Sequence, residues 1–208
     1  MIRAVISDFG GVLTTPLIES FLAYQEEAGV SVQELGATMA RSAEEDGGRH
    51  PLFELEKGAI TEDEFTRRLG AALGRELSSM RDTYFENLHP NAPMIEYLRG
   101  LREEGIRLAL LTNNVREWEP LWRAKLPDVD ELFEVIVDSG FVGMRKPEPK
   151  IYELTLERLG DGLRAEECAF LDDIEVNCDT ARTLGMTAVR FHDNEQAIGE
   201  MDVVLGRA

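Results

Sequence analysis

Short apolar runs alternate with longer segments of helical periodicity over most of this chain. Each short run is the length of a buried strand, and each longer segment repeats its apolar residues at helical spacing. This alternation predicts an α/β fold, in which helices cover both faces of a parallel sheet. The expected strands are residues 2–7, 107–111, 134–138, 167–171, 187–191 and 202–205, and the expected helices are residues 92–104, 117–125, 149–159 and 177–184.

Residues 17–88 interrupt the alternation, because their pattern is helical throughout. Thr61 and Glu64, three residues apart, form a capping-box pattern that marks one helix start within this segment. An insertion that follows the first strand lies near the carboxyl edge of the sheet, where α/β proteins carry their function. The expected organisation is a core domain of residues 1–15 and 90–208 with a helical cap of residues 16–89.

Several expected strands are followed by side chains that can carry chemistry. Asp8 comes directly after the first strand, and Gly10 and Gly11 come soon after it. The carboxyl ends of parallel strands meet at one edge of a sheet, so residues that follow different strands are brought into a single crevice there. The other polar residues expected in that crevice are Thr112, Asn113, Lys146, Asp172 and Asp173.

The charges in this crevice indicate a phosphoryl-transfer site that holds a divalent cation. Three neighbouring carboxylates, Asp8, Asp172 and Asp173, would repel one another and raise one another's pKa. A cation relieves that repulsion, and Mg²⁺ prefers oxygen ligands of this kind. Lys146 adds a fixed positive charge, and Thr112 adds a hydrogen-bond donor. A carboxylate among such groups can act as a covalent nucleophile, and we assign that role to Asp8.

Composition narrows the class of partner. The chain has 208 residues and a formal net charge of −18, and a nucleic-acid surface would need a basic footprint instead. Two cysteines are too few for a disulfide framework. The sequence contains neither an apolar run of membrane-spanning length nor a signal-peptide pattern. We therefore expect a cytoplasmic monomer or homodimer with no nucleic-acid or membrane partner.

Four motifs, in this order and spacing, resemble those of the haloacid dehalogenase-like (HAD) hydrolase superfamily. They are Asp8-Phe9-Gly10-Gly11-Val12, Leu111-Thr112-Asn113-Asn114, Arg145-Lys146-Pro147, and Phe170-Leu171-Asp172-Asp173 with Asn177. The chain is most similar to the branch that holds the N-terminal phosphatase domain of soluble epoxide hydrolase and small sugar-phosphate phosphatases. The resemblance covers essentially the whole chain, and it implies a Rossmann-like core with an inserted four-helix cap.

The resemblance also implies a role for each motif residue. Asp8 would form an aspartyl-phosphate with a small phosphorylated metabolite, such as a sugar phosphate. Thr112 and Asn113 would bind the transferring phosphoryl group, and Lys146 would offset the charge of the nucleophile and the phosphate. The implied Mg²⁺ ligands are Asp8, the backbone carbonyl of Gly10, Asp173 and Asp172.

Gly10 departs from the family pattern, because phosphatases of this family usually carry an aspartate two residues after the nucleophile. That aspartate protonates the leaving group, and such general acid–base help is worth about 10²–10⁴-fold in rate. His50 or His89 would then be candidates to replace it. The departure leaves two alternatives: a metal-independent 2-haloacid dehalogenase that uses Arg41 or Arg49 to bind halide, and a non-catalytic protein that binds a ligand or partner through its cap.

Overall fold

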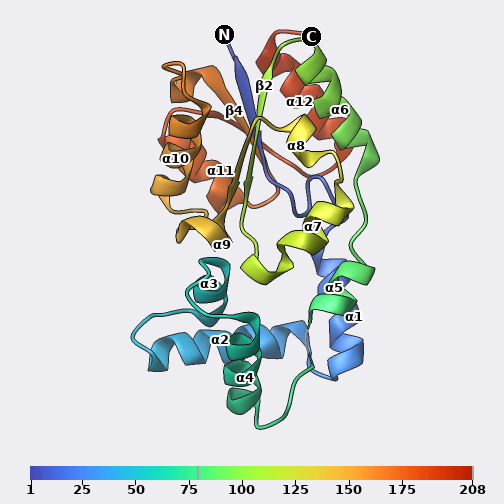
Figure 1. Ribbon diagram of the computed structural model, residues 1–208, viewed down its shortest axis with the longest axis vertical. Coiled ribbons are helices and arrows are strands. Elements are labelled where there is room, and N and C mark those ends of the chain that lie inside the picture. The colour runs from blue at the N-terminus through green and yellow to red at the C-terminus, as the bar shows by residue number, and fades with distance from the viewer. Residues whose placement is uncertain (79, 208) are drawn as a thin grey trace.

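A five-stranded parallel sheet forms the centre of the larger part of the molecule (Figure 1). The computed structural model describes residues 1–78 and 80–207. Within them the strands are β1 Ala4–Ser7, β2 Arg107–Thr112, β3 Val135–Asp138, β4 Cys168–Asp172 and β5 Thr187–Arg190. Their order is β3-β2-β1-β4-β5, which places β1 in the middle. Every residue of β1 and β4 is buried, as expected for parallel strands covered on both faces.

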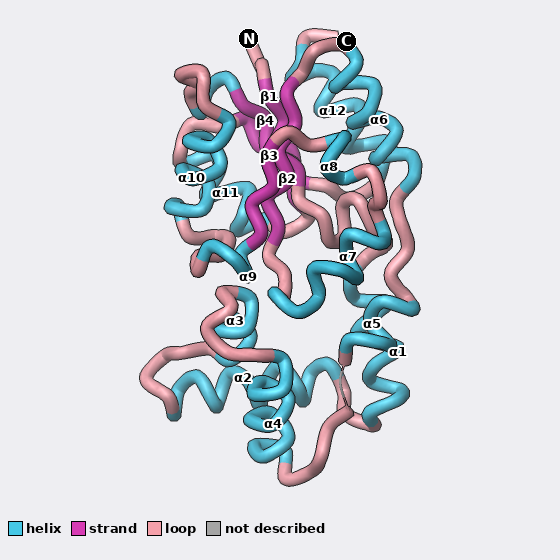
Figure 2. Tube along the Cα trace, in the orientation of Figure 1, coloured by secondary structure: helices cyan, strands magenta, loops and turns pink. Residues whose placement is uncertain are grey.

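Helices pack on both faces of the sheet, as the alternation predicts (Figure 2). Successive side chains of β1 point to opposite faces, so Val5 packs in one cluster with Leu98 of α6, and Ile6 packs in the other with Ile151 of α10. The helices after the insertion are α6 Ala92–Glu103, α7 Glu119–Lys125, α8 Val129–Leu132, α9 Ser139–Val142, α10 Pro149–Leu159, α11 Glu175–Thr183 and α12 Asn194–Leu205, with 3₁₀ turns at Arg116–Trp118 and Ala165–Glu167. None of the described helices is both long and apolar enough to span a bilayer.

The sixth expected strand, residues 202–205, is wrong, because these residues form the last turn of α12. The Asp193 side chain caps this helix by accepting a hydrogen bond from the Gln196 backbone N–H at 2.9 Å. Ala197 and Met201, four residues apart, are the positions that the helix buries. The β-branched valines near its end suggested a strand, but the helical spacing of the buried residues decides the structure.

Residues between β1 and α6 form the helical insertion, which lies at the carboxyl end of the sheet (Figure 1). It contains five helices in the described residues, where the resemblance implies four. Thr61 caps one of them by accepting from the Glu64 backbone N–H at 3.2 Å, while the Glu64 carboxylate pairs with Arg67 and Arg68 instead of completing the capping box. The helices are α1 Leu17–Ala28, α2 Val32–Glu45, α3 Pro51–Glu56, α4 Glu62–Leu73 and α5 Arg81–Glu86.

Two adjacent links join the insertion to the rest of the chain. Thr14 and Pro90 form an antiparallel bridge. The Thr15 N–H donates to the carbonyl of His89 at 2.8 Å, and the Asn91 N–H donates to the carbonyl of Leu13 at 2.8 Å. The insertion also contacts the sheet side through α3, which packs against α9. It is therefore held at one side by covalent links and at another by non-covalent contacts.

Candidate active site

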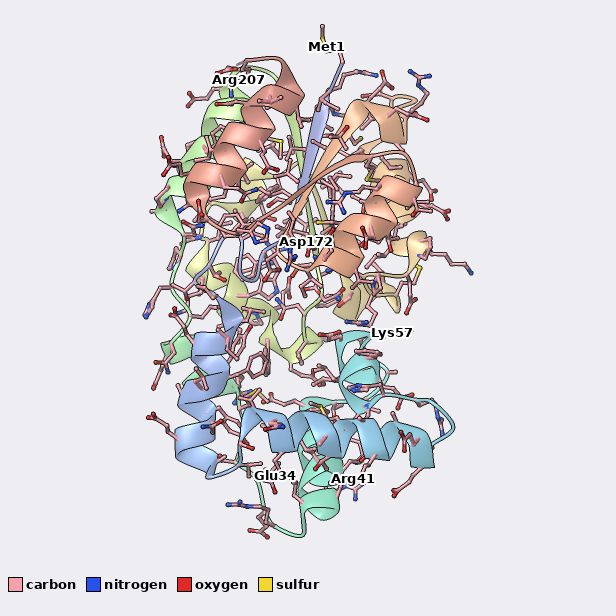
Figure 3. The ribbon with its side chains drawn as sticks, turned by 180° about the vertical axis from the view of Figure 1, so that it is seen from behind. Met1, Glu34, Arg41, Lys57, Asp172 and Arg207 are labelled. Atoms are coloured by element: carbon pink, nitrogen blue, oxygen red, sulfur yellow. The ribbon has the colours of Figure 1, made fainter. Side chains whose placement is uncertain are left out.

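Three carboxylates meet at the carboxyl edge of the sheet. Asp8 directly follows β1. Asp172 is the last residue of the neighbouring strand β4, and Asp173 directly follows it. Their ligand oxygens all lie within 4.8 Å of one another. Figure 3 labels Asp172 in this region and Lys57 on the side of the insertion that faces it. The adjacency of β1 and β4, which are far apart in the sequence, brings the predicted carboxylates together.

Lys146 lies between two of these carboxylates and is only 1% exposed. Its Nζ is 2.7 Å from Asp8 Oδ1 and 2.7 Å from Asp172 Oδ2. Burial lowers the pKa of Lys146, but Asp172 and Asp8 outweigh burial and leave this pKa raised. A fixed ammonium therefore stands beside Asp8, as the sequence predicts for Lys146.

Asn113 fixes the backbone that carries this lysine. Its Oδ1 accepts from the Lys146 N–H at 2.8 Å, and its Nδ2 donates to the Lys146 carbonyl at 3.0 Å. Both ends of the Asn113 amide are thereby used in holding the loop. Thr112, at the end of β2, is buried beside it and forms no side-chain hydrogen bond within the described part of the chain. Its hydroxyl is free to bind a phosphoryl oxygen.

The two adjacent aspartates have different surroundings. Asp172 is fully buried and accepts hydrogen bonds from Lys146 Nζ at 2.7 Å, from the Ile174 N–H at 2.9 Å and from Asn177 Nδ2 at 3.0 and 3.2 Å. Asp173 Oδ1 is also buried, yet it has no partner among the described residues. Burial raises the pKa of Asp173, and the nearby Asp172 adds to this effect. Asp172 thus holds Lys146, while Asp173 has a free oxygen.

These groups fit a magnesium ion. A buried carboxylate oxygen without a partner is costly unless a donor or a cation satisfies it. Burial raises the pKa of Asp8, Lys146 opposes this, and Asp172 and Asp173 increase it further. A hard cation with oxygen ligands would lower that pKa and satisfy Asp173 Oδ1. The Gly10 carbonyl accepts no hydrogen bond within the described residues, so it is also free to bind the ion.

Two glycines after Asp8 shape the loop in different ways. Gly11 has a φ of 79°, and a Cβ there would lie 2.6 Å from Asp173 Oδ2, so only glycine permits this approach. A Cβ at Gly10 would lie 3.0 Å from Cδ1 of Leu17. The space beside Gly10 is thus filled by an apolar side chain of the insertion.

The chain was compared with families of known proteins. The family model of haloacid dehalogenase-like hydrolases matches residues 2–185. This chain belongs to the HAD-like hydrolase family.

One relative matches this HAD-like hydrolase over nearly the whole of both proteins. It is the sesquiterpene phosphatase astK of Aspergillus oryzae, which is 28% identical over 98% of this chain and 97% of that protein. The bifunctional epoxide hydrolase 2 of Rattus norvegicus is 29% identical over 99% of this chain. The chain spans only 39% of that epoxide hydrolase. The HAD family enzyme bt-2542 of Bacteroides thetaiotaomicron, solved as a magnesium complex, has a TM-score of 0.68 and 26% identity, with 100% of this chain and 99% of that chain covered.

A cavity of about 290 Å³ lies between the insertion and the sheet edge of this hydrolase. On its polar side are Asn113, Asn114, and the ion pair of Arg145 with Glu56 at 2.5 Å. Burial raises the pKa of Glu56, and Arg145 opposes this. Most of the remaining lining is apolar and includes Leu17, Phe21, Leu55, Phe65, Tyr84 and Trp118. The cavity therefore suits a neutral, largely apolar group.

A second, smaller cavity of about 30 Å³ lies next to the Asp8 loop. Gly10 and Thr112 border it from the sheet side, and Leu17 and Tyr84 border it from the insertion. Leu17 and Tyr84 also line the larger cavity. The two spaces are therefore neighbours that share the boundary formed by these side chains.

Several candidate residues lie outside both cavities. His50 stacks on Phe53 with ring centroids 4.2 Å apart, and Arg41 and Arg49 bind Thr38 and Asp46 respectively. None of these three residues lines either of the two cavities, and His89 does not line them either. The tryptophans at positions 118 and 122 are both buried in the fold.

Sequence reasoning missed Tyr84, Glu56 and Arg145 as lining residues. Arg145 directly precedes Lys146, so its place in that motif is the one signal that points to it. Glu56 and Tyr84 carry no comparable signal, because each lies in a helical segment whose partners are distant in the sequence.

Proposed function

We propose that this HAD-like hydrolase is a Mg²⁺-dependent phosphomonoesterase that works through an aspartyl-phosphate on Asp8. The observation that carries the proposal is the arrangement around Asp8: Lys146 Nζ is 2.7 Å from its carboxylate, and Asp173, which belongs to the same carboxylate cluster, has an unpartnered oxygen among the described residues. The magnesium complex of the related enzyme bt-2542 supports the assignment of the metal.

Each residue of the site has a defined task in this reaction. Asp8 Oδ attacks phosphorus, and water then hydrolyses the resulting acyl phosphate. Lys146 neutralises charge on the nucleophile and on the transferring group, while Asp172 and Asn113 hold that lysine in place. Thr112 donates its hydroxyl proton to a phosphoryl oxygen. Bound Mg²⁺, held by Asp8, Asp173 and the Gly10 carbonyl with Asp172 nearby, would supply electrostatic stabilisation of the phosphoryl oxygens.

The cavity lining indicates the kind of leaving group. A sugar would leave its hydroxyl groups facing Phe21, Leu55 and Phe65 without hydrogen bonds, which is costly. A hydrocarbon group would instead gain about 25 cal/mol for each Å² of apolar surface that it buries there. We therefore propose that the substrate is a phosphomonoester of a largely apolar alcohol rather than a sugar phosphate. The name of the relative astK, a sesquiterpene phosphatase, supports this choice.

The proposal gives the helical insertion the role of a cap. We propose that residues 16–89 select the leaving group, while residues 1–15 and 90–208 carry the phosphoryl chemistry. The division is supported by the cavity, because the insertion supplies most of its apolar lining, whereas Asn113, Asn114 and Arg145 come from the part of the chain that carries Asp8. A molecule with phosphate at one end and hydrocarbon at the other matches that division.

Phosphate release from decyl phosphate, glucose 1-phosphate and 4-nitrophenyl phosphate tests the proposal, with and without excess Mg²⁺. We expect release that requires Mg²⁺, a higher kcat/KM for decyl phosphate than for glucose 1-phosphate, and no release after Asp8→Asn. Asp128→Asn, on the surface near α8, is the matched control and should behave as wild type.

Other results would contradict parts of this proposal. Equal phosphate release in chelator, or full activity after Asp8→Asn, would refute the mechanism. Metal-independent halide release from 2-chloropropionate would establish the dehalogenase instead. Retained Mg²⁺ binding without turnover of any substrate would favour a non-catalytic binding protein.

A further inference from the structure

Tyr84 differs from the other tyrosines of the chain in the hydrogen bonding of its hydroxyl group. The chain has four tyrosines. Three of them donate a hydrogen bond: Tyr24 to the Ser78 carbonyl at 2.8 Å, Tyr97 to Asp202 Oδ1 at 2.8 Å and Tyr152 to the Asn177 carbonyl at 3.0 Å. The Tyr84 hydroxyl has no such partner in the described part of the chain, although the residue is only 8% exposed. The hydroxyl oxygen itself is not enclosed, so a ligand in the cavity that Tyr84 lines can reach it.

The ring of Tyr84 is held in place by aromatic neighbours. Its centroid lies 5.6 Å from that of Phe21, 5.2 Å from that of Phe85 and 5.1 Å from that of Trp118. Contacts on several sides leave the ring little freedom to turn its hydroxyl toward another partner. The position of the hydroxyl is therefore set by packing and not by a hydrogen bond.

Tyr84 also lies where the two cavities meet. Four residues border both the small cavity at the Asp8 loop and the larger apolar cavity: Leu17, Tyr84, Asn113 and Asn114. Leu17 has no polar group, and the Asn113 amide is used by the Lys146 backbone. Of the four, Tyr84 alone has a hydroxyl proton that can be transferred to another oxygen.

Nearby charges keep this hydroxyl in its neutral form. Burial raises the pKa of Tyr84, and the negative charges of Asp8, Glu56 and Asp173 raise it further. The phenol therefore keeps its proton throughout the ordinary working range of pH. It is available as a donor whenever a substrate is bound.

We propose that Tyr84 is a catalytic residue, whose hydroxyl donates its proton to the bridging oxygen of the leaving alcohol. This inference rests on the proposed phosphatase function. The phosphoryl group lies beside Asp8 and Thr112, and the apolar body lies in the larger cavity, so the bridging oxygen falls where the two spaces meet. Leu17 of α1 fills the space beside Gly10, and Tyr84 lines the same small cavity from α5, which packs against α1.

The proton balance of the reaction closes with these groups. In the first step an Asp8 oxygen bonds to phosphorus, the bond from phosphorus to the bridging oxygen breaks, and the Tyr84 proton moves to the departing oxygen. This step leaves an aspartyl-phosphate, a neutral alcohol and a phenolate. In the second step water bonds to phosphorus, the acyl-phosphate bond breaks, and the phenolate takes a proton from that water. The products are free Asp8, hydrogen phosphate and neutral Tyr84.

Tyr84→Phe tests the inference, because it removes the hydroxyl and keeps the packed ring. A decyl alkoxide is strongly basic and needs the proton, whereas 4-nitrophenolate is a stable anion that leaves without it. We expect kcat/KM for decyl phosphate to fall by about 100-fold, and kcat/KM for 4-nitrophenyl phosphate to change by less than about threefold. Tyr97→Phe is the matched control, since it removes a hydroxyl far from the site.

A second measurement uses the wild-type protein alone. The rate for decyl phosphate should fall in D₂O more than the rate for 4-nitrophenyl phosphate, because a proton moves only when the alkoxide departs. An equal loss on both substrates after Tyr84→Phe, or no loss on either, would overturn the inference. So would a selective loss on decyl phosphate after Glu56→Gln but not after Tyr84→Phe, since Glu56 would then be the donor. If wild-type protein releases phosphate from neither substrate, the proposed function itself fails.

Discussion

Replacing Asp172 by Asn and replacing Asp173 by Asn should have different consequences, although the two residues are adjacent. In chelator, Asp172→Asn should lower the free energy of unfolding strongly, whereas Asp173→Asn should leave it unchanged or raise it. With Mg²⁺ present, Asp173→Asn should lower the affinity for the ion by at least about tenfold. One residue would thus support the fold of the site, and the other would support its metal.

The expected change in the free energy of unfolding follows from the hydrogen bonds at each carboxylate. Asp172→Asn removes the charge that pairs with the buried Lys146 at 2.7 Å. One oxygen remains for the Ile174 N–H, so the new NH₂ group must face Lys146 Nζ or Asn177 Nδ2, which are both donors. Loss of a charged hydrogen bond, together with a poorly compensated buried lysine, costs about 3 kcal/mol. Asp173→Asn removes one of three mutually repelling charges, and Asp173 Oδ1 has no hydrogen-bond partner among the described residues that the substitution could break.

Urea denaturation in chelator gives the stability of each variant, and calorimetric titration gives its affinity for Mg²⁺. Asp179→Asn, an exposed position on α11, is the control for the loss of one negative charge. The reasoning is refuted if Asp172→Asn costs less than about 1 kcal/mol, or if Asp173→Asn costs as much as Asp172→Asn. Unchanged affinity for Mg²⁺ in Asp173→Asn would refute the assignment of the metal ligand.

Three other outcomes are expected. Gly58→Ala should lower the unfolding free energy by about 2 kcal/mol in urea denaturation, because φ is 64° there and a Cβ would collide with the Gly140 carbonyl. Burial raises the pKa of Asp138 to about 6, although hydrogen bonds from Gly140 and Trp122 oppose this shift. Because the folded protein then binds the proton more tightly than the unfolded chain does, stability should fall as pH rises from about 4 through about 6. Trp122 fluorescence should titrate over this range in wild type but not in Asp138→Asn. Burial raises the pKa of both cysteines to about 12, so native protein should not react with a thiol reagent that labels both residues in denaturant.

The sequence was sufficient to predict much of the fold and the charged part of the site. Asp8 and Asp173 directly follow buried strands, and the rule that parallel strands end at one edge is enough to bring them together. Lys146 lies beyond α9 in the loop that follows β3, and its place beside Asp8 depends on the loop that Asn113 holds. The different roles of Asp172 and Asp173 were not predictable from the sequence. These roles depend on which of the two carboxylates accepts hydrogen bonds from Asn177 and from the Ile174 N–H. Those contacts exist only after β4 and α11 have folded.

The chemistry of the insertion was less accessible from the sequence. A tyrosine on the apolar side of a helical segment usually belongs to the core. Tyr24 and Tyr84 both fit that pattern, and only the three-dimensional contacts show that Tyr24 has a hydrogen-bond partner and that Tyr84 has none among the described residues. Asn113 illustrates the same limit, since its bonds to Lys146 join residues that are 33 positions apart.

The insertion is tied to the rest of the chain at two separate places. On one side, the Thr14–Pro90 bridge joins its two covalent links. On the other side, the Glu56 carboxylate pairs with Arg145, and the Glu56 carbonyl accepts from the Ser139 hydroxyl at 2.6 Å. Glu56 and Arg145 also line the larger cavity. A substitution at either residue would therefore change the lining of the cavity and the docking of the insertion together.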